Sequence, residues 1–334
     1  MNNIEPVHIA PIRVDDMHMD NMPVEVRPLR EADLPEADRI FRLAFGTFLG
    51  LPEPLAFAGD ADFVGTRWRA SPEAALGAYV DGVLVGSNFA ARWGSFGFFG
   101  PLTVHPDLWD KGIARRLLAA TMSLFERWGT RHAALFTFPQ SAKHVGLYQA
   151  FGFWPQQLTP VMSKPAGATL EAGTWRAYSD LDGESRIATL GACRALTDAI
   201  HPGLDVTSEI ESASRQGIGD TVLVHDGCEL VAFAICHLGK GSEAGSGAAY
   251  VKFGAAHPGP AAGAHFERLL SACEAMAHAR GMAQLVAGVN TSRHDAYRQM
   301  LARGFRTVLQ GVAMQQANAH GYNRADCFVI DDWR

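Results

Sequence analysis

The feature that most constrains the fold is a self-similarity at a constant spacing of 152 residues. Three dipeptides recur in one ungapped register: His105-Pro106 as His257-Pro258, Leu117-Leu118 as Leu269-Leu270, and Gly152-Phe153 as Gly304-Phe305. An Asp-Gly turn between apolar runs also recurs, "YVDGVLVG" from Tyr79 and "LVHDGCELVA" from Leu223. Because 334 residues exceed what one core usually serves, we infer two copies of one folding unit.

Hydrophobic periodicity gives the content of each unit. In the first copy it predicts strands at 24–28, 74–80, 83–92, 96–104, 133–138 and 157–163, and helices at 33–45, 112–128 and 142–151. The second copy repeats this order, and the final "NRADCFVIDDWR" suits an additional strand. We therefore predict an α/β protein of two tandem domains, each with a mostly antiparallel central sheet flanked by helices. The expected boundaries are an N-terminal arm at 1–23 and domains at 24–165 and 172–334, joined by "KPAGATLEAG".

Charge and motif content exclude several classes of protein. The formal net charge of −6 argues against nucleic-acid binding, and no stretch approaches the 18 apolar residues of a membrane span. The 13 histidines are scattered without an HExxH pattern, and neither GxxxxGK[ST] nor GxGxxG follows a strand, so we expect no metal site and no nucleotide fold of those types. The five cysteines lack CxxC spacing and read as buried reduced thiols. Because the first 23 residues contain no apolar core of signal-peptide length and no later stretch is long enough to span a membrane, we expect a cytoplasmic protein.

Three motifs of the first copy point to a family. A strand ends in "LTVHP", "WDKGIA" opens a helix, and "LYQAFGF" follows further on. In these elements the first half, over most of 24–165, resembles the GNAT superfamily of acyl-CoA-dependent N-acetyltransferases, and 172–315 resembles it more faintly. The resemblance implies transfer of an acetyl group from acetyl-CoA to a primary amine.

The "WDKGIARR" stretch suits a phosphate site for a physical reason. A helix N-terminus leaves its first N–H groups unpaired and carries a partial positive charge, so it can hold a pyrophosphate. Gly112 and Ala114 leave those amides accessible, and Arg115 or Arg116 adds charge. Together with the backbone of the preceding strand, which the family uses for the pantetheine arm, the expected acetyl-CoA contacts are Leu102, Thr103, Val104, Asp110, Lys111, Gly112, Ile113, Ala114, Arg115, Arg116 and Ser141.

Tyr148 occupies the position where the family places a general acid. A phenol, with a reference pKa of about 10, can protonate the thiolate that leaves when an amine attacks the thioester. The alternative is an aromatic residue that only packs in the core. The sequence departs from the family in having Trp109 for the usual Arg or Gln, Ser141 for a frequent Asn, and no carboxylate in "FGFFGPLTV".

The proton acceptor therefore stays open. Glu53, Asp60 and Asp62 are candidates because their loop belongs to the region where the family builds its acceptor pocket, and a water relay is the alternative. His105 reads as an ordinary strand-end residue.

The second copy has lost the residues of this chemistry. In the repeat register Ala264, Phe266 and Glu267 replace Gly112, Ala114 and Arg115, and Met300 replaces Tyr148. Tyr297, three residues before Met300, is the weaker alternative for a general acid there. We expect this half to keep the fold without binding the cofactor, closing a wall of the acceptor cleft or lengthening the sheet. Arg334 is expected on the surface rather than in the cleft.

These observations favour an N-acetyltransferase that uses acetyl-CoA, with no metal, and a small-molecule or peptide amine as the acceptor. A non-catalytic acyl-CoA-binding or protein-interaction module is the alternative from a different class. A homodimer is left open as the assembly.

Overall fold

A computed structural model describes residues 23–167 and 175–334. The expected arm at 1–23, apart from its last residue, and most of the expected linker lie outside the described residues. The first half contains β1 (Val24–Pro28), α1 (Leu34–Phe48), α2 (Val64–Ala70), β2 (Ala75–Val80), β3 (Val83–Trp93), β4 (Phe96–Phe99), β5 (Thr103–Val104), α3 (Ile113–Trp128), β6 (His132–Thr137), α4 (Ala142–Gln149) and β7 (Phe153–Pro165).

The second half repeats this order with local changes. It contains β8 (Trp175–Ala177), α5 (Gly183–Ile200), α6 (Thr207–Gln216), β9 (Gly219–Asp226), β10 (Glu229–Leu238), β11 (Ala248–Ala256), α7 (Ala262–Ala279), β12 (Gln284–Gly288), α8 (His294–Ala302), β13 (Arg306–Gln316) and β14 (Val329–Ile330). The additional strand expected near the end of the sequence is therefore present as β14. No helix in the described ranges is long and apolar enough to cross a membrane.

One expected strand is divided in two. Residues 96–104 form β4 and β5, with Gly100 and Pro101 between them. Proline has no N–H to donate to a strand ladder, so pairing stops at this point. The break changes partners as well: β4 pairs with β3 and β6, whereas β5 pairs with β3 alone.

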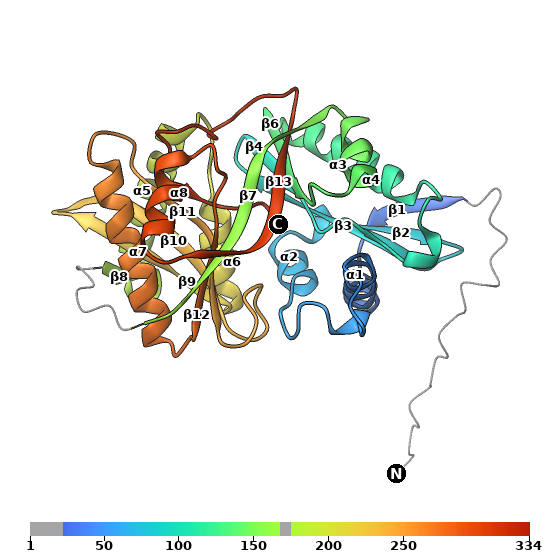
Figure 1. The fold of residues 1–334 in the computed structure, drawn as a ribbon, viewed down its shortest axis with the longest axis horizontal. Helices are drawn as coiled ribbons and strands as arrows, with labels where there is room; N and C mark the ends of the chain where they lie inside the picture. Colours follow the sequence, from blue (N-terminus) through green and yellow to red (C-terminus); the bar gives the residue numbers. More distant parts are fainter. Residues whose placement is uncertain (1–22, 168–174) are drawn as a thin grey trace, which may run out of the picture.

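Alternation along β2 sends its side chains to two helical layers. Ala75 and Tyr79 belong to the core under α1, while Leu76 and Val80 pack with Ile113 of α3 on the opposite face. The sheet of the first half is thus covered by α1 and α2 on one side and by α3 and α4 on the other (Figure 1).

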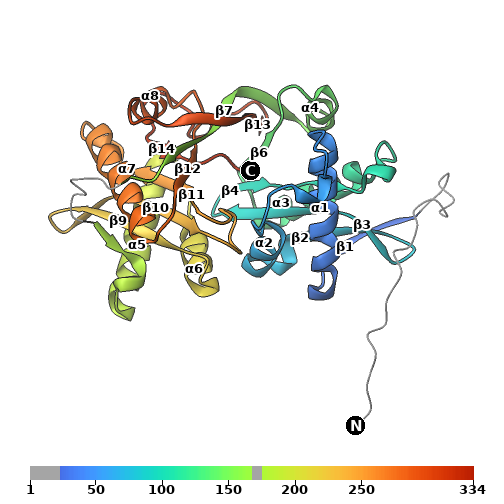
Figure 2. The same cartoon turned by 60° about the horizontal axis from the view of Figure 1, so that its bottom comes forward.

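The sheets of the two halves are joined, as in the expected alternative that the second half lengthens the sheet. The strand order is β1-β2-β3-β4-β6-β13-β7-β12-β11-β10-β9-β8, with β5 paired to β3 and β14 to β11. β13 of the second half lies between β6 and β7, and β7 of the first half reaches β12 (Figures 1 and 2). β7 and β13 pair with each other, so the central sheets expected for the two domains form one sheet of 14 strands within the described residues.

Candidate active site

A cavity of about 600 Å³ opens in the first half where two parallel strands diverge. β4 and β6 pair in parallel from Phe96 and His132 up to Phe99 and Leu135. Beyond these residues β4 gives way to the Gly100-Pro101 break, and the cavity occupies the gap between the strands. Its walls come from α1, β4 to β5, the start of α3, β6, α4 and the last two residues of the sequence.

The start of α3 has the backbone conformation of an anion cradle. Asp110 and Gly112 both have positive φ, 68° and 77°, before the helix begins at Ile113. A left-handed residue beside right-handed ones turns successive N–H groups toward one point. A Cβ built on Gly112 would meet no atom within 4 Å, so the space beside these amides is open. The expected Asp110, Gly112, Ile113, Ala114 and Arg115 line the cavity, whereas Lys111 and Arg116 do not.

A cation beside the cradle comes from an element that sequence reasoning did not consider. Lys143, in the first turn of α4, pairs with Asp110 at 2.7 Å and lies 5.7 Å from the centre of the Trp109 ring. Lys143 therefore supplies positive charge close to the position where Trp109 replaces the family's Arg or Gln. Ser141 also lines the cavity, but its hydroxyl caps α4 by accepting from the His144 amide at 3.3 Å.

The edge of β5 opposite β3 pairs with no other strand of the described residues, and Leu102 to Val104 line the cavity. The His105 amide donates to the Val85 carbonyl at 2.9 Å, so alternation along the antiparallel pair directs Thr103 toward β3 and Leu102 and Val104 away from it. The Val104 carbonyl accepts from the Trp109 indole at 2.9 Å. Of the three residues expected to meet the pantetheine arm, Leu102 and Val104 thus have the better-placed backbone.

Tyr148 lies in the cavity wall on α4, and its side chain packs against Phe99 with ring centres 5.9 Å apart. None of the described residues forms a hydrogen bond with its hydroxyl. Burial raises the pKa of this phenol above its usual value, so it remains protonated at neutral pH. A protonated, unpartnered hydroxyl in the wall can donate to a group in the cavity.

The part of the cavity beyond Tyr148 is lined mainly by aromatic rings, and we call it the aromatic chamber. Its phenylalanines are Phe41, Phe45, Phe48, Phe57, Phe63, Phe99, Phe136 and Phe138. Leu309 and Trp333 of the second half complete the wall. Gly311 of β13 leaves room for the Phe136 ring, because a Cβ there would lie 2.0 Å from it. β13 of the second half therefore shapes this chamber. The repeat pattern in the sequence did not predict this contribution.

The three carboxylates expected as proton acceptors lie elsewhere. Asp60 accepts from the Ser246 amide at 2.8 Å, which ties its loop to the second half. Asp62 accepts from the Gly65 amide at 2.6 Å and pairs with Arg69 at 2.9 Å. Glu53 is exposed, and none of the three lines the cavity. The described lining residue able to accept a proton near neutral pH is His144, whose pKa is lowered by burial and by Lys143.

The expectation of an exposed Arg334 is wrong. Its side chain is 21% exposed, lies 4.1 Å from the centre of the Tyr250 ring and pairs with Asp332 at 3.3 Å. Together with Trp333 it forms part of the cavity wall. Tyr250 and Asp332 of its own half thus cover the side chain, while Arg67 of the first half donates to its backbone oxygen.

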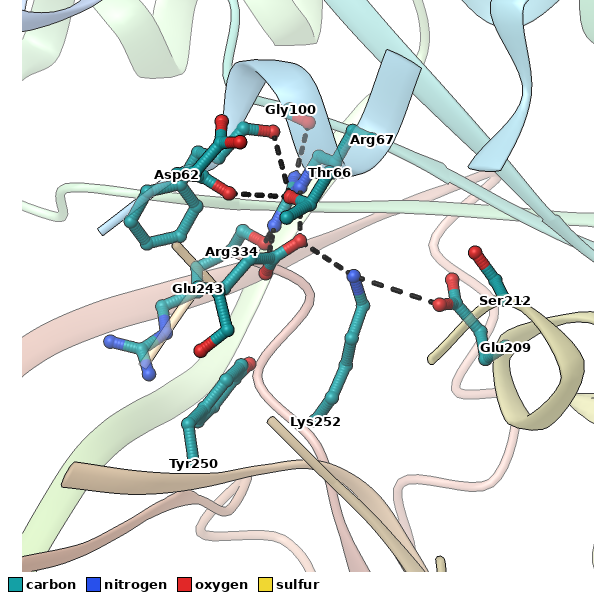
Figure 3. A network of polar contacts seen from close by, with 12 residues as sticks. Asp62, Thr66, Arg67, Gly100, Glu209, Ser212, Glu243, Tyr250, Lys252 and Arg334 are labelled. Atoms are coloured by element: carbon teal, nitrogen blue, oxygen red, sulfur yellow. Dashed lines mark hydrogen bonds and ion pairs between the residues drawn. The ribbon is translucent and has the colours of Figure 1, made fainter. Parts of the chain in front are cut away.

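A buried charge cluster holds this wall against the first half (Figure 3). Arg67 of α2 pairs with Glu243 at 2.9 Å and also donates to the carbonyl oxygens of Gly100 and Arg334. Lys252 of β11 pairs with the same Glu243 at 2.7 Å and reaches Glu209 at 3.7 Å. Glu243 is fully buried, and its two cations hold its pKa well below the usual range despite the cost of desolvation. Arg67 thereby connects the strand break at Gly100 with the second half.

The corresponding region of the second half is filled in two ways. α7 begins at Ala262, so the positions that correspond to Asp110, Lys111 and Gly112 are helical and form no cradle. Phe266 and Met300, which replace Ala114 and Tyr148, are completely buried.

A strand also occupies the region of the second half that corresponds to the cavity. β14 pairs with Gly254 and Ala255 of β11, and the Ala256 amide donates to the Phe328 carbonyl at 3.0 Å. These three residues correspond to Leu102, Thr103 and Val104, so β14 lies against the equivalent of the strand edge that faces the cavity in the first half.

Metal-binding geometry is absent from residues 23–167 and 175–334, in which no group of three or more His, Cys, Asp or Glu side chains could hold an ion.

Comparison with known proteins gives a family model and a set of similar structures. The model of the acetyltransferase (GNAT) family matches residues 38–153. Comparison with curated protein sequences gives no match.

Three solved structures are similar in fold over most of the chain. A proposed acetyltransferase from Pyrococcus horikoshii is 14% identical with a TM-score of 0.65, covering 95% of this chain and 99% of that one. A GCN5-related N-acetyltransferase from Sphaerobacter thermophilus is 15% identical with a TM-score of 0.57, covering 89% and 96%. One from Anabaena variabilis is 13% identical with a TM-score of 0.52, covering 88% and 72%. At these identities the likeness establishes the fold.

Proposed function

Because residues 38–153 match the model of the acetyltransferase (GNAT) family, we propose that the protein transfers an acetyl group from acetyl-CoA to a primary amine in the cavity of the first half. The family acts through acyl-CoA. The amine acceptor, the use of Tyr148 and the division of labour between domains at 24–165 and 172–334 are the proposed part.

The observation that carries the proposal is the meeting of three features in one cavity. The cradle at Gly112, the free edge of β5 and the Tyr148 hydroxyl all line it. The first suits a pyrophosphate, the second an amide-bearing arm and the third a leaving sulfur. In the second half, the position of the cradle is helical, and the corresponding strand edge is covered by β14. Met300 stands at the position of Tyr148.

Acetyl-CoA supplies a thioester whose acetyl carbonyl an amine can attack, with CoA as the leaving thiol. The α3 amides and Lys143 would hold its phosphates, and the Leu102 and Val104 backbone would hold its pantetheine arm. Tyr148 would give its proton to the departing sulfur.

His144 is the proposed proton acceptor, directly or through water. It lies one helical turn before Tyr148 on α4, and its ring centre lies 5.0 Å from that of Phe48. Since burial and Lys143 lower its pKa, the imidazole is neutral at pH 7 and can accept the proton of an attacking amine.

Thiol release from acetyl-CoA in the presence of an amine panel tests the function. We expect Tyr148→Phe to lower kcat/KM by about 10²-fold or more, the range of general acid catalysis, while the Kd of acetyl-CoA stays unchanged. Binding of acetyl-CoA without turnover of any amine would instead support a non-catalytic acyl-CoA-binding module. Absence of acetyl-CoA binding to folded protein would refute the proposal.

A further inference from the structure

We propose that the acceptor is a compact monoamine with an aromatic or similarly apolar body, which the aromatic chamber binds. This rests on the proposed function and concerns the other substrate of the same site. The charge, shape and continuity of the chamber carry the inference.

Six of the chamber's eight phenylalanines, together with His144, form one connected series of ring contacts. Ring centres are 5.0 Å apart between His144 and Phe48, 5.1 Å between Phe48 and Phe138, and 6.2 Å between Phe138 and Phe45. The wall continues through Phe57, stacked on Phe45 at 5.2 Å. Spacings of this size are those of interacting aromatic pairs, and a further ring can pack against them at edge or face.

The same wall continues to the far side of the chamber. Phe41 lies 5.5 Å from both Phe57 and Phe63. Five of the chamber's phenylalanines are only partly buried by the protein: Phe45, Phe48, Phe57, Phe63 and Phe136. Their uncovered ring area faces a cavity rather than being shielded by other side chains, so an apolar ligand would remove it from water.

The charges on the cavity wall disfavour an acceptor with several positive groups. The carboxylate side chain among the described lining residues is Asp110, which lies at the cradle and is paired with Lys143. The other ionised side chains there are cations, Arg115 and Arg334. The nearby Glu243 is completely buried behind Arg67 and already bonded to two cations, so it offers no counter-ion to a ligand.

A monoamine suits these surroundings because its one nitrogen can lose its charge at the reaction centre. A desolvated ammonium favours its neutral form, which is the nucleophile, and the ring faces stabilise the fraction that stays charged. A polyamine would carry further ammonium groups into the same chamber, where the one carboxylate side chain among the described lining residues, Asp110, is already paired with Lys143. A peptide acceptor is also disfavoured, because its backbone N–H and C=O groups would be buried among aromatic side chains without hydrogen-bond partners.

The second half limits the size of the body. Leu309 and Trp333 of the second half line the cavity, and Trp333 is held in place by edge-on packing against Tyr322, with ring centres 5.9 Å apart. Because the cavity of about 600 Å³ also contains the region beside Tyr148 and the cradle, the space left for an acceptor suits one or two rings.

The experiment compares kcat/KM with acetyl-CoA for 2-phenylethylamine, tryptamine, spermidine and a lysine-containing peptide. We expect the two arylalkylamines to exceed spermidine and the peptide by 10²-fold or more. Phe48→Glu adds a carboxylate to the chamber wall. In this variant we expect the ratio of kcat/KM for 2-phenylethylamine to kcat/KM for spermidine to fall by at least 10-fold. Phe48→Leu keeps the wall apolar and should change this ratio by less than 3-fold. Trp154→Glu, an exposed position on β7 outside the cavity, is the matched control and should leave the ratio unchanged.

Four outcomes would contradict the inference or the function on which it rests. Turnover of spermidine or the peptide equal to that of the arylalkylamines overturns the inference while leaving an acetyltransferase in place. A preference for octanoyl-CoA over acetyl-CoA, with arylalkylamines no better than polar amines, would assign the chamber to the acyl chain and also overturn it. Failure of folded protein to bind acetyl-CoA, measured by calorimetry, refutes the proposed function itself. Phe48→Glu that retains the wild-type ratio while binding acetyl-CoA normally contradicts the charge argument.

Discussion

A matched pair of substitutions, Gly112→Glu and Ala264→Glu, tests the cradle most directly. The two positions correspond in the repeat register, and both are exposed. Gly112 precedes α3 with φ of 77°, whereas Ala264 lies within the first turn of α7. The same side chain thus lies beside open amides in one half and on a continuous helix in the other.

The expected loss follows from charge. A carboxylate about 5 Å from one phosphate charge costs roughly 1 to 3 kcal/mol at an effective dielectric constant between about 80 and 20. With two phosphate charges and an exposed site, we take about 3 kcal/mol, which corresponds to roughly a 10²-fold rise in the Kd of CoA. The positive φ adds about 1 to 2 kcal/mol of strain that affects folding rather than binding, because the Cβ itself meets nothing within 4 Å.

Calorimetric titration of CoA into folded protein measures the effect. Gly112→Ala has the same backbone strain without the charge, and we expect its Kd to rise by less than about 10-fold. Ala264→Glu should leave the Kd of CoA unchanged, because this position is helical and forms no cradle. The variant should also fold, since a carboxylate in the first turn of a helix is favourable. Equal weakening by Gly112→Glu and Ala264→Glu would refute the assignment of phosphate binding to the first half alone. Equal weakening by Gly112→Ala and Gly112→Glu would refute the charge argument.

Three further predictions concern charge and stability. Lys143→Ala should raise the Kd of CoA several-fold at low salt, and the difference from wild type should shrink as added salt screens the contact, as titrations at two ionic strengths would show. Glu243→Gln should lower the free energy of unfolding by about 3 to 5 kcal/mol, because it leaves Arg67 and Lys252 buried without their shared charged partner. The control Glu126→Gln, at an exposed position, should change this free energy by less than about 0.5 kcal/mol. Similar denaturant midpoints for Glu243→Gln and wild type would contradict the prediction. Burial lowers the pKa of His132 to about 4 and that of His237 to about 3, so below about pH 6.5 the unfolded chain binds protons that the folded chain does not, and stability should fall with decreasing pH by about 1.4 kcal/mol per unit for each histidine; an unchanged unfolding free energy between pH 7 and 5 would refute this.

Local patterns in the sequence were sufficient for the elements and for part of the site. The strand at 24–28 and the helix beginning after Gly112 follow from apolar spacing and from a glycine at a helix start, and the structure has both. Leu102, Val104, Gly112 and Tyr148 were grouped through the resemblance to the GNAT superfamily, and all four line the cavity. Lys143 was missed, although its position in the first turn of α4 was evident from the expected helix.

Other parts of the site depend on contacts between residues far apart in the sequence. Arg67 and Glu243 are separated by 176 positions, and neither residue has a local pattern that marks it as one of a pair. The carboxylates of the acceptor loop were reasonable candidates by position, yet Asp60 and Asp62 are used to hold the loop in place. Hydrogen bonds to a loop's own backbone and to a neighbouring domain cannot be counted from spacing alone.

The sequence by itself predicts two copies of one α/β unit, and it determines that Gly112 and Tyr148 of the first have Ala264 and Met300 at the corresponding positions of the second. These properties depend on residue identity within a few turns of chain. The tertiary structure alone decided that β7 and β13 exchange partners, that β14 covers the second groove, and that Trp333 and Arg334 reach the first cavity. The reason is that any sheet edge can pair with many strands of similar pattern, and the choice among them is made by the packing of the whole chain.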